Sequence, residues 1–231
     1  MRVEIWSDIV CPFCYIGKRK FENALKEFKA KDNVEIIWKS FQLDPDVVPI
    51  TGQSVDQYLA NRKGVSLEKG KEMNDSMSNI ASEVGLEYNL NTAVVNNTMN
   101  AHRLLHLAKQ HGVQDDAKEA LFKAYYTDSK NIGDNETLIL IGESVGLDPA
   151  AIRSMLESDL YINEVRKDQY EAQQIGVQGV PFFVFNNKYA VSGAQSPEVF
   201  SEVLEKAYDE EIPALEIVST GGSCTTDGAC N

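Results

Sequence analysis

Two cysteines stand two residues apart near the start of the chain, in the motif Cys11-Pro12-Phe13-Cys14. A thiol reacts as the thiolate, and a free cysteine with a pKa of about 8.5 holds little thiolate at neutral pH. At a helix start, unpaired backbone N–H groups and the helix dipole favour the thiolate of the first cysteine in such a motif. The pattern therefore predicts a redox-active dithiol, in which Cys11 attacks a disulfide and Cys14 resolves the mixed disulfide.

The elements around this motif are predicted from the spacing of apolar residues. Residues 3–9 are rich in β-branched and aromatic residues, which predicts a strand, and apolar residues then recur every three or four positions after Cys14. Pro12 suits the first turn of a helix, where its missing N–H costs nothing. A second strand is predicted over residues 34–38. The opening of the chain is thus a βαβ unit with Cys11 at the junction of strand and helix.

Helical patterns dominate the middle of the chain, and strand patterns return near its end. The predicted helices cover residues 67–84, 98–110, 117–126, 137–145 and 152–174. Residues 182–185 and 189–191 have the period of strands, and Asn186-Asn187 between them predicts a hairpin. A last helix is predicted over residues 196–208. The expected order is βαβ, a helical block, ββα and a glycine-containing tail.

A second cysteine pair, Cys224 and Cys230, lies in this tail with five residues between the two thiols. Gly228 gives the segment the freedom to close as a local disulfide. One interpretation is a second redox pair that exchanges electrons with Cys11 and Cys14, and another is a disulfide without a catalytic role. A zinc site built from all four cysteines is a third interpretation, although the two pairs differ in spacing. We expect no metal.

Length and charge limit the classes of protein. The 231 residues allow one large domain or a small domain with an insertion, and 22 basic against 35 acidic residues give a formal net charge of −13. Such a surface repels nucleic acid. No apolar run approaches the roughly 18 to 20 residues of a membrane span, and the first residues lack the pattern of a signal peptide. We therefore expect a soluble cytoplasmic protein without nucleic-acid or membrane partners, in which cysteines serve chemistry more often than structure.

Three separated segments resemble the DsbA-like thioredoxin family, in its FrnE-type branch. They are Asp8-Ile9-Val10-Cys11-Pro12-Phe13-Cys14-Tyr15-Ile16-Gly17, Asn97-Thr98-Met99-Asn100-Ala101-His102-Arg103-Leu104 and Gly176-Val177-Gln178-Gly179-Val180-Pro181. The resemblance spans about residues 2–208 and implies an α/β fold, namely a thioredoxin fold with a large all-helical insertion. The implied division is residues 1–51 and 175–209 for the thioredoxin-like domain, 52–174 for the insertion and 210–231 for the tail.

The resemblance also implies how the site is built. A cis peptide bond before Pro181 would face the dithiol, and the backbone of Val180 would contact the substrate together with Pro12 and Phe13. Asn97, His102 and Arg103 would lie near the cleft, with Asn97 and His102 as candidate substrate contacts. Thiol exchange itself needs a proton acceptor, and Asp8, three residues before Cys11, is either the candidate acceptor for Cys14 or an ordinary residue of the turn.

The expected activity is thiol–disulfide oxidoreduction on protein or low-molecular-weight disulfides, without a bound cofactor and with glutathione as a candidate co-substrate. Periplasmic DsbA has histidine where this chain has Phe13, so we expect a less acidic Cys11 and a less oxidising couple. The alternative is a glutathione-dependent isomerase or transferase related to 2-hydroxychromene-2-carboxylate isomerase. Enzymes of that branch carry serine at the first position, so Cys11 argues against it. The sequence leaves the oligomeric state open.

Overall fold

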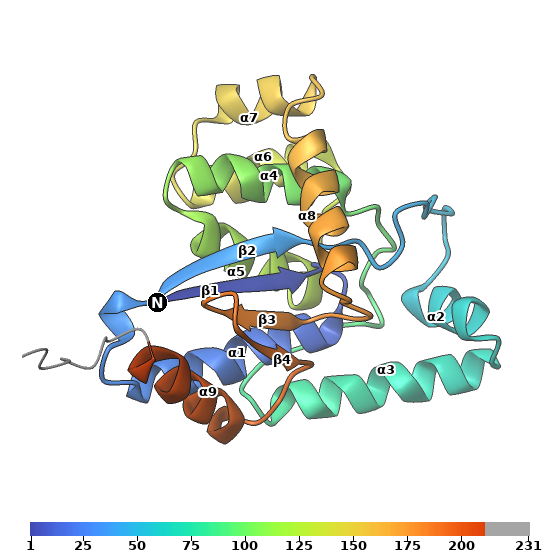
Figure 1. Cartoon of the computed structure of the whole chain (residues 1–231). Coiled ribbons are helices and arrows are strands. Elements are labelled where there is room, and N and C mark those ends of the chain that lie inside the picture. The colour runs from blue at the N-terminus through green and yellow to red at the C-terminus, as the bar shows by residue number, and fades with distance from the viewer. Residues whose placement is uncertain (211–231) are drawn as a thin grey trace, which may run out of the picture.

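The computed structural model describes residues 1–210, and its centre is a four-stranded sheet in the order β2-β1-β3-β4 (Figure 1). β1 (Arg2–Ser7) and β2 (Glu35–Ser40) are parallel, because the helix between them carries the chain back to the end of the sheet at which β1 begins. β3 (Phe182–Phe185) is antiparallel to β1, and β4 (Tyr189–Ser192) is antiparallel to β3. Strands from the two ends of the chain therefore complete one sheet.

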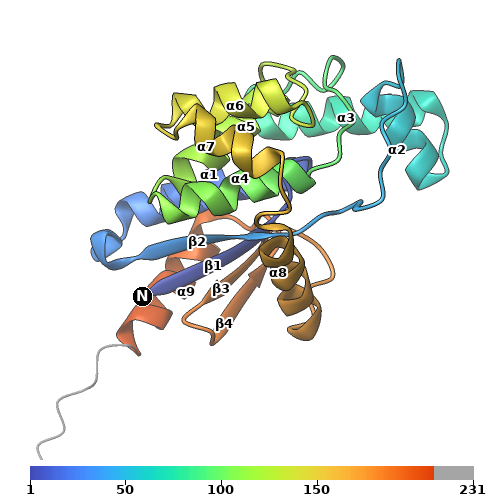
Figure 2. The same cartoon turned by 90° about the horizontal axis from the view of Figure 1, so that it is seen from above.

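Helices cover both faces of this sheet. α1 (Pro12–Glu27) and α9 (Pro197–Asp209) contact each other on one face, and α8 (Ile162–Gln174) lies against β2 on the other (Figure 2). The remaining helices stand between β2 and α8 in the sequence: α2 (Val55–Lys63), α3 (Leu67–Ser82), α4 (Met99–Gln110), α5 (Gln114–Tyr126), α6 (Asn135–Ser144) and α7 (Pro149–Leu156). Among residues 1–210, none of the helices is long and apolar enough to cross a membrane.

Alternation along β1 divides the core between the two faces. Val3 and Ile5 are fully buried against α1 and α9, where Phe21 and Phe200 pack in an edge-to-face pair. On the opposite face, Trp6 donates a hydrogen bond of 2.8 Å from Nε1 to the backbone oxygen of Asp168 in α8. α8, the last helix of the expected insertion, therefore packs directly on the sheet.

The order of elements predicted from the sequence is confirmed, including the hairpin. Asn186 and Asn187 have φ values of 49° and 55°, as a tight turn between two twisted strands requires. The first strand is shorter than predicted and ends at Ser7, because the chain then turns and Cys11 N–H donates to the Asp8 oxygen at 3.3 Å. α2 was not predicted as a separate helix, since its apolar residues follow no clear stripe.

The single helix predicted over residues 152–174 is wrong, because the chain breaks between α7 and α8. Tyr161 adopts a left-handed conformation with φ of 66° at this break. Arg103 of α4 explains it, because this residue is 3% exposed and its guanidinium donates to the backbone oxygens of Met155, Ser158 and Leu160. A buried cation thus satisfies carbonyls at the end of α7. Arg103 has this structural role and is not among the residues that line the cleft described below.

Candidate active site

The dithiol lies at the start of α1, just after the turn that follows β1. Cys11 is the N-cap residue of α1, Pro12 is its first residue, and Cys14 N–H donates to the Cys11 oxygen at 2.9 Å. Both cysteines are free thiols. Cys11 is 5% exposed, whereas Cys14 is fully buried one turn into the helix. This difference in exposure suits a first thiol that reacts with a substrate sulfur and a buried second thiol that then attacks the first.

The peptide bond between Val180 and Pro181 is cis, as the family resemblance implies, and its loop contacts the dithiol. Cys11 Sγ lies 3.3 Å from the backbone oxygen of Val180, to which the thiol donates a hydrogen bond. Gly17 in α1 makes this approach possible, since a Cβ at that position would stand 2.9 Å from Cγ of Pro181. Two motifs that are 169 residues apart in the sequence thus form one site.

The surroundings of Cys11 do not favour its thiolate in the way that the helix start alone predicts. The neighbouring Cys14 thiol and burial raise the pKa of Cys11 well above its ordinary value, and the charge of Asp8 adds to this effect. This direction is opposite to the low pKa that the position of Cys11 at a helix start predicts.

A cleft of about 420 Å³ opens beside Cys11, between the start of α1 and the two helices α2 and α3. Pro12 and Phe13 line it together with Cys11, and Phe13 is 43% exposed. Four charged residues also line it, Asp8, Asp44, Arg62 and Lys63, and of these Arg62 pairs with Asp44. Most of the wall is apolar and includes Val10, Leu59, Met73, Met77, Leu90 and Val95.

Asp8 and His102 form a buried pair near the dithiol. His102 is fully buried, and its Nε2 lies 3.3 Å from Asp8 Oδ1 and 3.1 Å from the Phe41 oxygen. Two oxygen acceptors around one ring nitrogen assign the proton to Nε2. Burial lowers the pKa of His102, against the opposing effect of Asp8. The other oxygen of Asp8 accepts the N–H of Leu43 at 2.8 Å. His102 therefore orients Asp8 from behind the cleft and does not line it.

Asn97 occupies a joint between loops. Its side-chain oxygen accepts the N–H of Met99 at 3.0 Å, and its amide donates to the Pro45 oxygen at 2.9 Å. Gln42 also donates to Asn97, at 3.2 Å. Asn97 thus ties the segment after β2 to the start of α4, and it is not among the residues that line the cleft. A contact of Asn97 with substrate stays a prediction.

The sequence interpretation missed an aromatic layer under the motif. Tyr15 stacks on Phe122 with ring centroids 4.8 Å apart, and Tyr88 stacks on Tyr126 at 4.2 Å. The Tyr88 hydroxyl donates to the Pro12 oxygen at 2.7 Å. The aromatic run Phe122 to Tyr126 signals a buried helix face, but Tyr88 lies in an irregular loop where no periodicity marks it.

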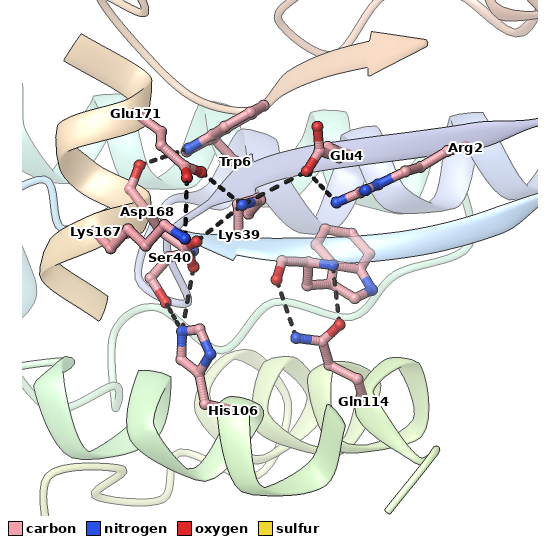
Figure 3. A network of polar contacts seen from close by, with 11 residues as sticks. Arg2, Glu4, Trp6, Lys39, Ser40, His106, Gln114, Lys167, Asp168 and Glu171 are labelled. Carbon is pink, nitrogen blue, oxygen red and sulfur yellow. Dashed lines mark hydrogen bonds and ion pairs between the residues drawn. The ribbon is translucent and has the colours of Figure 1, made fainter. Parts of the chain in front are cut away.

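A second polar cluster lies on the other face of the sheet (Figure 3). Asp168 binds His106 Nε2 at 3.2 Å, Lys39 at 3.1 Å and the Ser40 N–H at 2.8 Å. Ser40 Oγ also meets His106, at 3.1 Å, but through the same Nε2. A catalytic triad needs the two ring nitrogens to face different partners. This cluster is therefore a structural joint between α8, β2 and α4.

Cys224 and Cys230 lie outside the described residues. Within residues 1–210, no group of three or more His, Cys, Asp and Glu side chains is arranged to hold a metal ion.

Comparison with known proteins places these features in a family. The model of the DSBA-like thioredoxin domain matches residues 2–205. The chain is 31% identical to the uncharacterized protein YwbO of Bacillus subtilis over 91% of this chain and 97% of that protein. A probable DsbA oxidoreductase from Streptomyces coelicolor, SCO1869, shares 39% identity and a TM-score of 0.86 over 100% and 98% of the two chains. The cytosolic disulfide reductase DsbM of Pseudomonas aeruginosa, also solved with GSH, shares the fold at 14% identity, with a TM-score of 0.62 over 91% and 100%. The chain belongs to the DsbA-like thioredoxin family of disulfide oxidoreductases.

Proposed function

We propose that this enzyme exchanges thiols and disulfides through a mixed disulfide at Cys11, which Cys14 resolves. One observation carries the assignment of roles: Cys11 lines the cleft and touches the cis-proline loop, whereas Cys14 is fully buried behind it. A substrate sulfur can reach Cys11, whereas Cys14, in the first turn of α1, is covered until Cys11 has reacted. The assignment agrees with membership of the family.

The exchange consists of two displacements. The Cys11 thiolate attacks one sulfur of a substrate disulfide, and the other sulfur leaves as a thiolate that takes a proton from solvent. Cys14, after losing its proton, attacks Cys11 Sγ, so that the Cys11 and Cys14 bond forms as the bond to the substrate sulfur breaks. The substrate gains two electrons and the enzyme dithiol loses them. Glutathione is the proposed thiol that returns these electrons.

The cleft supports a substrate with an apolar group next to its sulfur. Asp44 and Arg62 in its wall form an ion pair, and Met73 and Met77 contribute apolar surface to the same cleft as Cys11. Val180, Pro181 and Phe13 border the position of the incoming sulfur. We propose protein disulfides as the main substrates and small disulfides as secondary ones. The proposed compartment is the cytoplasm, and the FrnE-type branch is the proposed subgroup.

The Cys14→Ser variant tests this function. Incubated with oxidised glutathione, it is expected to accumulate a stable mixed disulfide at Cys11, because the resolving thiol is missing. The wild type is expected to form the internal disulfide reversibly under the same conditions. Alkylation followed by mass spectrometry at a series of glutathione ratios measures both. Absence of an internal disulfide in the wild type at every ratio would reject the oxidoreductase.

The same variant separates the alternative function. A glutathione-dependent isomerase or transferase would use Cys11 to activate glutathione and would need no resolving thiol. Its activity on a small aromatic substrate would survive the change of Cys14 to serine. The buried position of Cys14 directly behind Cys11 favours the oxidoreductase.

We propose Cys224 and Cys230 as a second redox pair that exchanges electrons with the first. Changing both to serine is expected to slow re-reduction of the Cys11 and Cys14 disulfide by glutathione, while leaving the first attack of Cys11 on substrate unchanged. Single-turnover and steady-state rates of the double variant measure the two steps. Equal rates in both assays would leave the tail pair without a role in the relay. The zinc interpretation is tested on the wild type, whose metal content after purification would reveal such a site.

A further inference from the structure

Lys118 in α5 is a fully buried lysine whose ammonium has no polar partner among the described residues. Its side chain is fully buried, and its Nζ lies 4.7 Å from the ring centroid of Phe122 and 5.2 Å from that of Trp38. Within residues 1–210, this nitrogen forms no hydrogen bond. The two rings provide cation–π contacts, which replace only part of the lost hydration. This lysine therefore lowers stability where it stands.

Burial also changes the pKa of this lysine. Burial lowers the pKa of Lys118 to about 8, and negative charge on Cys14, Asp8 or Cys11 acts in the opposite direction. A methionine could fill the same space without this cost. A strongly shifted group beside a reactive centre is typical of a functional residue.

The charged groups around Lys118 come from several elements. Asp8 follows β1, and His102 lies on α4. Cys11 is the N-cap of α1, and Cys14 and Lys18 lie in that helix. Asp8 is already engaged by His102 and by the N–H of Leu43. Lys18 is held by three carboxylates, those of Glu22, Asp115 and Glu119. Lys118 thus differs from Lys18, because no carboxylate holds its ammonium.

The effect of charge is mutual, so the ammonium that a thiolate stabilises also stabilises the thiolate. Cys14 stands first among the groups whose negative charge raises the pKa of Lys118. Phe122 of α5, whose ring Lys118 contacts, also stacks on Tyr15, the residue that follows Cys14. Lys118 is therefore a buried cation without a carboxylate partner whose charge interacts with the thiols of the dithiol.

We propose that Lys118 is a positioning residue of the resolving step, whose buried ammonium stabilises the Cys14 thiolate that attacks the mixed disulfide at Cys11. This proposal rests on the proposed function. Cys14 releases its proton to solvent, and its sulfur then displaces the substrate thiolate from Cys11. Once the internal disulfide has formed, no thiolate remains opposite Lys118, and reduction restores it. Lys118 therefore favours the reduced enzyme and the attacking form of Cys14.

The test uses the full chain carrying a mixed disulfide between Cys11 and glutathione, in wild type, Lys118→Met and Lys118→Arg. Release of glutathione is followed between pH 6 and 9. Lys118→Met is expected to release glutathione about tenfold more slowly at pH 7, and its rate is expected to rise at a pH about one unit higher. The equilibrium with glutathione is expected to shift about tenfold toward the disulfide. Lys118→Arg is expected to restore part of both effects.

Lys123→Met is the matched control, because Lys123 lies on the same helix but is exposed and pairs with Asp128. A Lys118→Met enzyme with the wild-type pH profile and equilibrium would overturn the proposal. If the wild type itself fails to release glutathione and form the internal disulfide, the proposed function fails instead. Should Lys118→Met not fold, NMR titration of the Lys118 side chain in the wild type decides: a higher pKa in the reduced form is expected, and equal pKa values in both forms would reject the role.

Discussion

Cys11→Ser is expected to lower disulfide turnover on the order of 10³-fold or more, because a serine oxygen cannot form the mixed disulfide on which both steps depend. The variant is expected to fold normally, since serine is close in size to cysteine and the neighbouring Val180 oxygen accepts its hydroxyl as it accepts the thiol. Turnover is measured as reduction of a peptide disulfide in glutathione buffer. Circular dichroism and thermal unfolding check the fold.

Ser196→Ala is the matched control, because Ser196 is the N-cap of α9 and stands outside the cleft. It is expected to keep wild-type turnover. A Cys11→Ser enzyme that keeps a tenth or more of the wild-type rate would mean that another thiol carries the first attack. In that case Cys14 or the tail pair would have to be the nucleophile.

Asp168→Ala is expected to destabilise the protein by about 3–5 kcal/mol, the usual cost of removing one partner of a buried ion pair. Asp168 is 4% exposed and holds Lys39, His106 and the Ser40 N–H together. Without it, the joint between α8 and the sheet loses its shared acceptor. Urea unfolding at pH 7 measures the change. Glu136→Ala, which removes one partner of the exposed pair with Arg153, is the control and is expected to leave the urea midpoint nearly unchanged.

The effect of Asp168→Ala depends on pH in a definite direction. Burial raises the pKa of Asp168, but hydrogen bonds from His106 and the Ser40 N–H and the charge of Lys39 outweigh it, so the pKa lies below its ordinary value. The unfolded chain then binds more protons than the folded one below about pH 4. The stability that Asp168 contributes is present above that pH and is lost as the pH falls. An equal difference between wild type and variant at pH 7 and pH 3 would contradict the ion-pair explanation.

The sequence predicted those elements whose start or turn is set by neighbouring residues. Pro12 at the first turn marked the start of α1 and placed Cys11 at the N-cap, and the Asn186-Asn187 pair marked the hairpin. The break before Tyr161 escaped prediction, because the residue that stabilises it is Arg103, on another helix. Periodicity identifies a buried face but does not name its partner.

The candidate site was predicted only where its residues carry a chemical signature. Cys11 and Cys14 do so by type and spacing, whereas Lys118 looks like a polar position in an amphipathic helix. The pairing of Asp8 with His102 joins residues 94 positions apart, and burial removes His102 from the cleft wall. These relations arise from tertiary packing, which composition and spacing do not contain. The resemblance of the segments containing Val180 and His102 located the neighbourhood but not the contacts.

The pairing of β1 with β3 has a consequence for the newly made chain. β1 and the dithiol emerge from the ribosome first, whereas β3 and the Val180-Pro181 loop that cover Cys11 follow about 170 residues later. At about 5–20 residues per second, roughly ten to thirty seconds pass between the two. During that interval both thiols are open to oxidants and to thiols of other nascent chains. The sheet therefore encloses the dithiol only after most of the chain has been made.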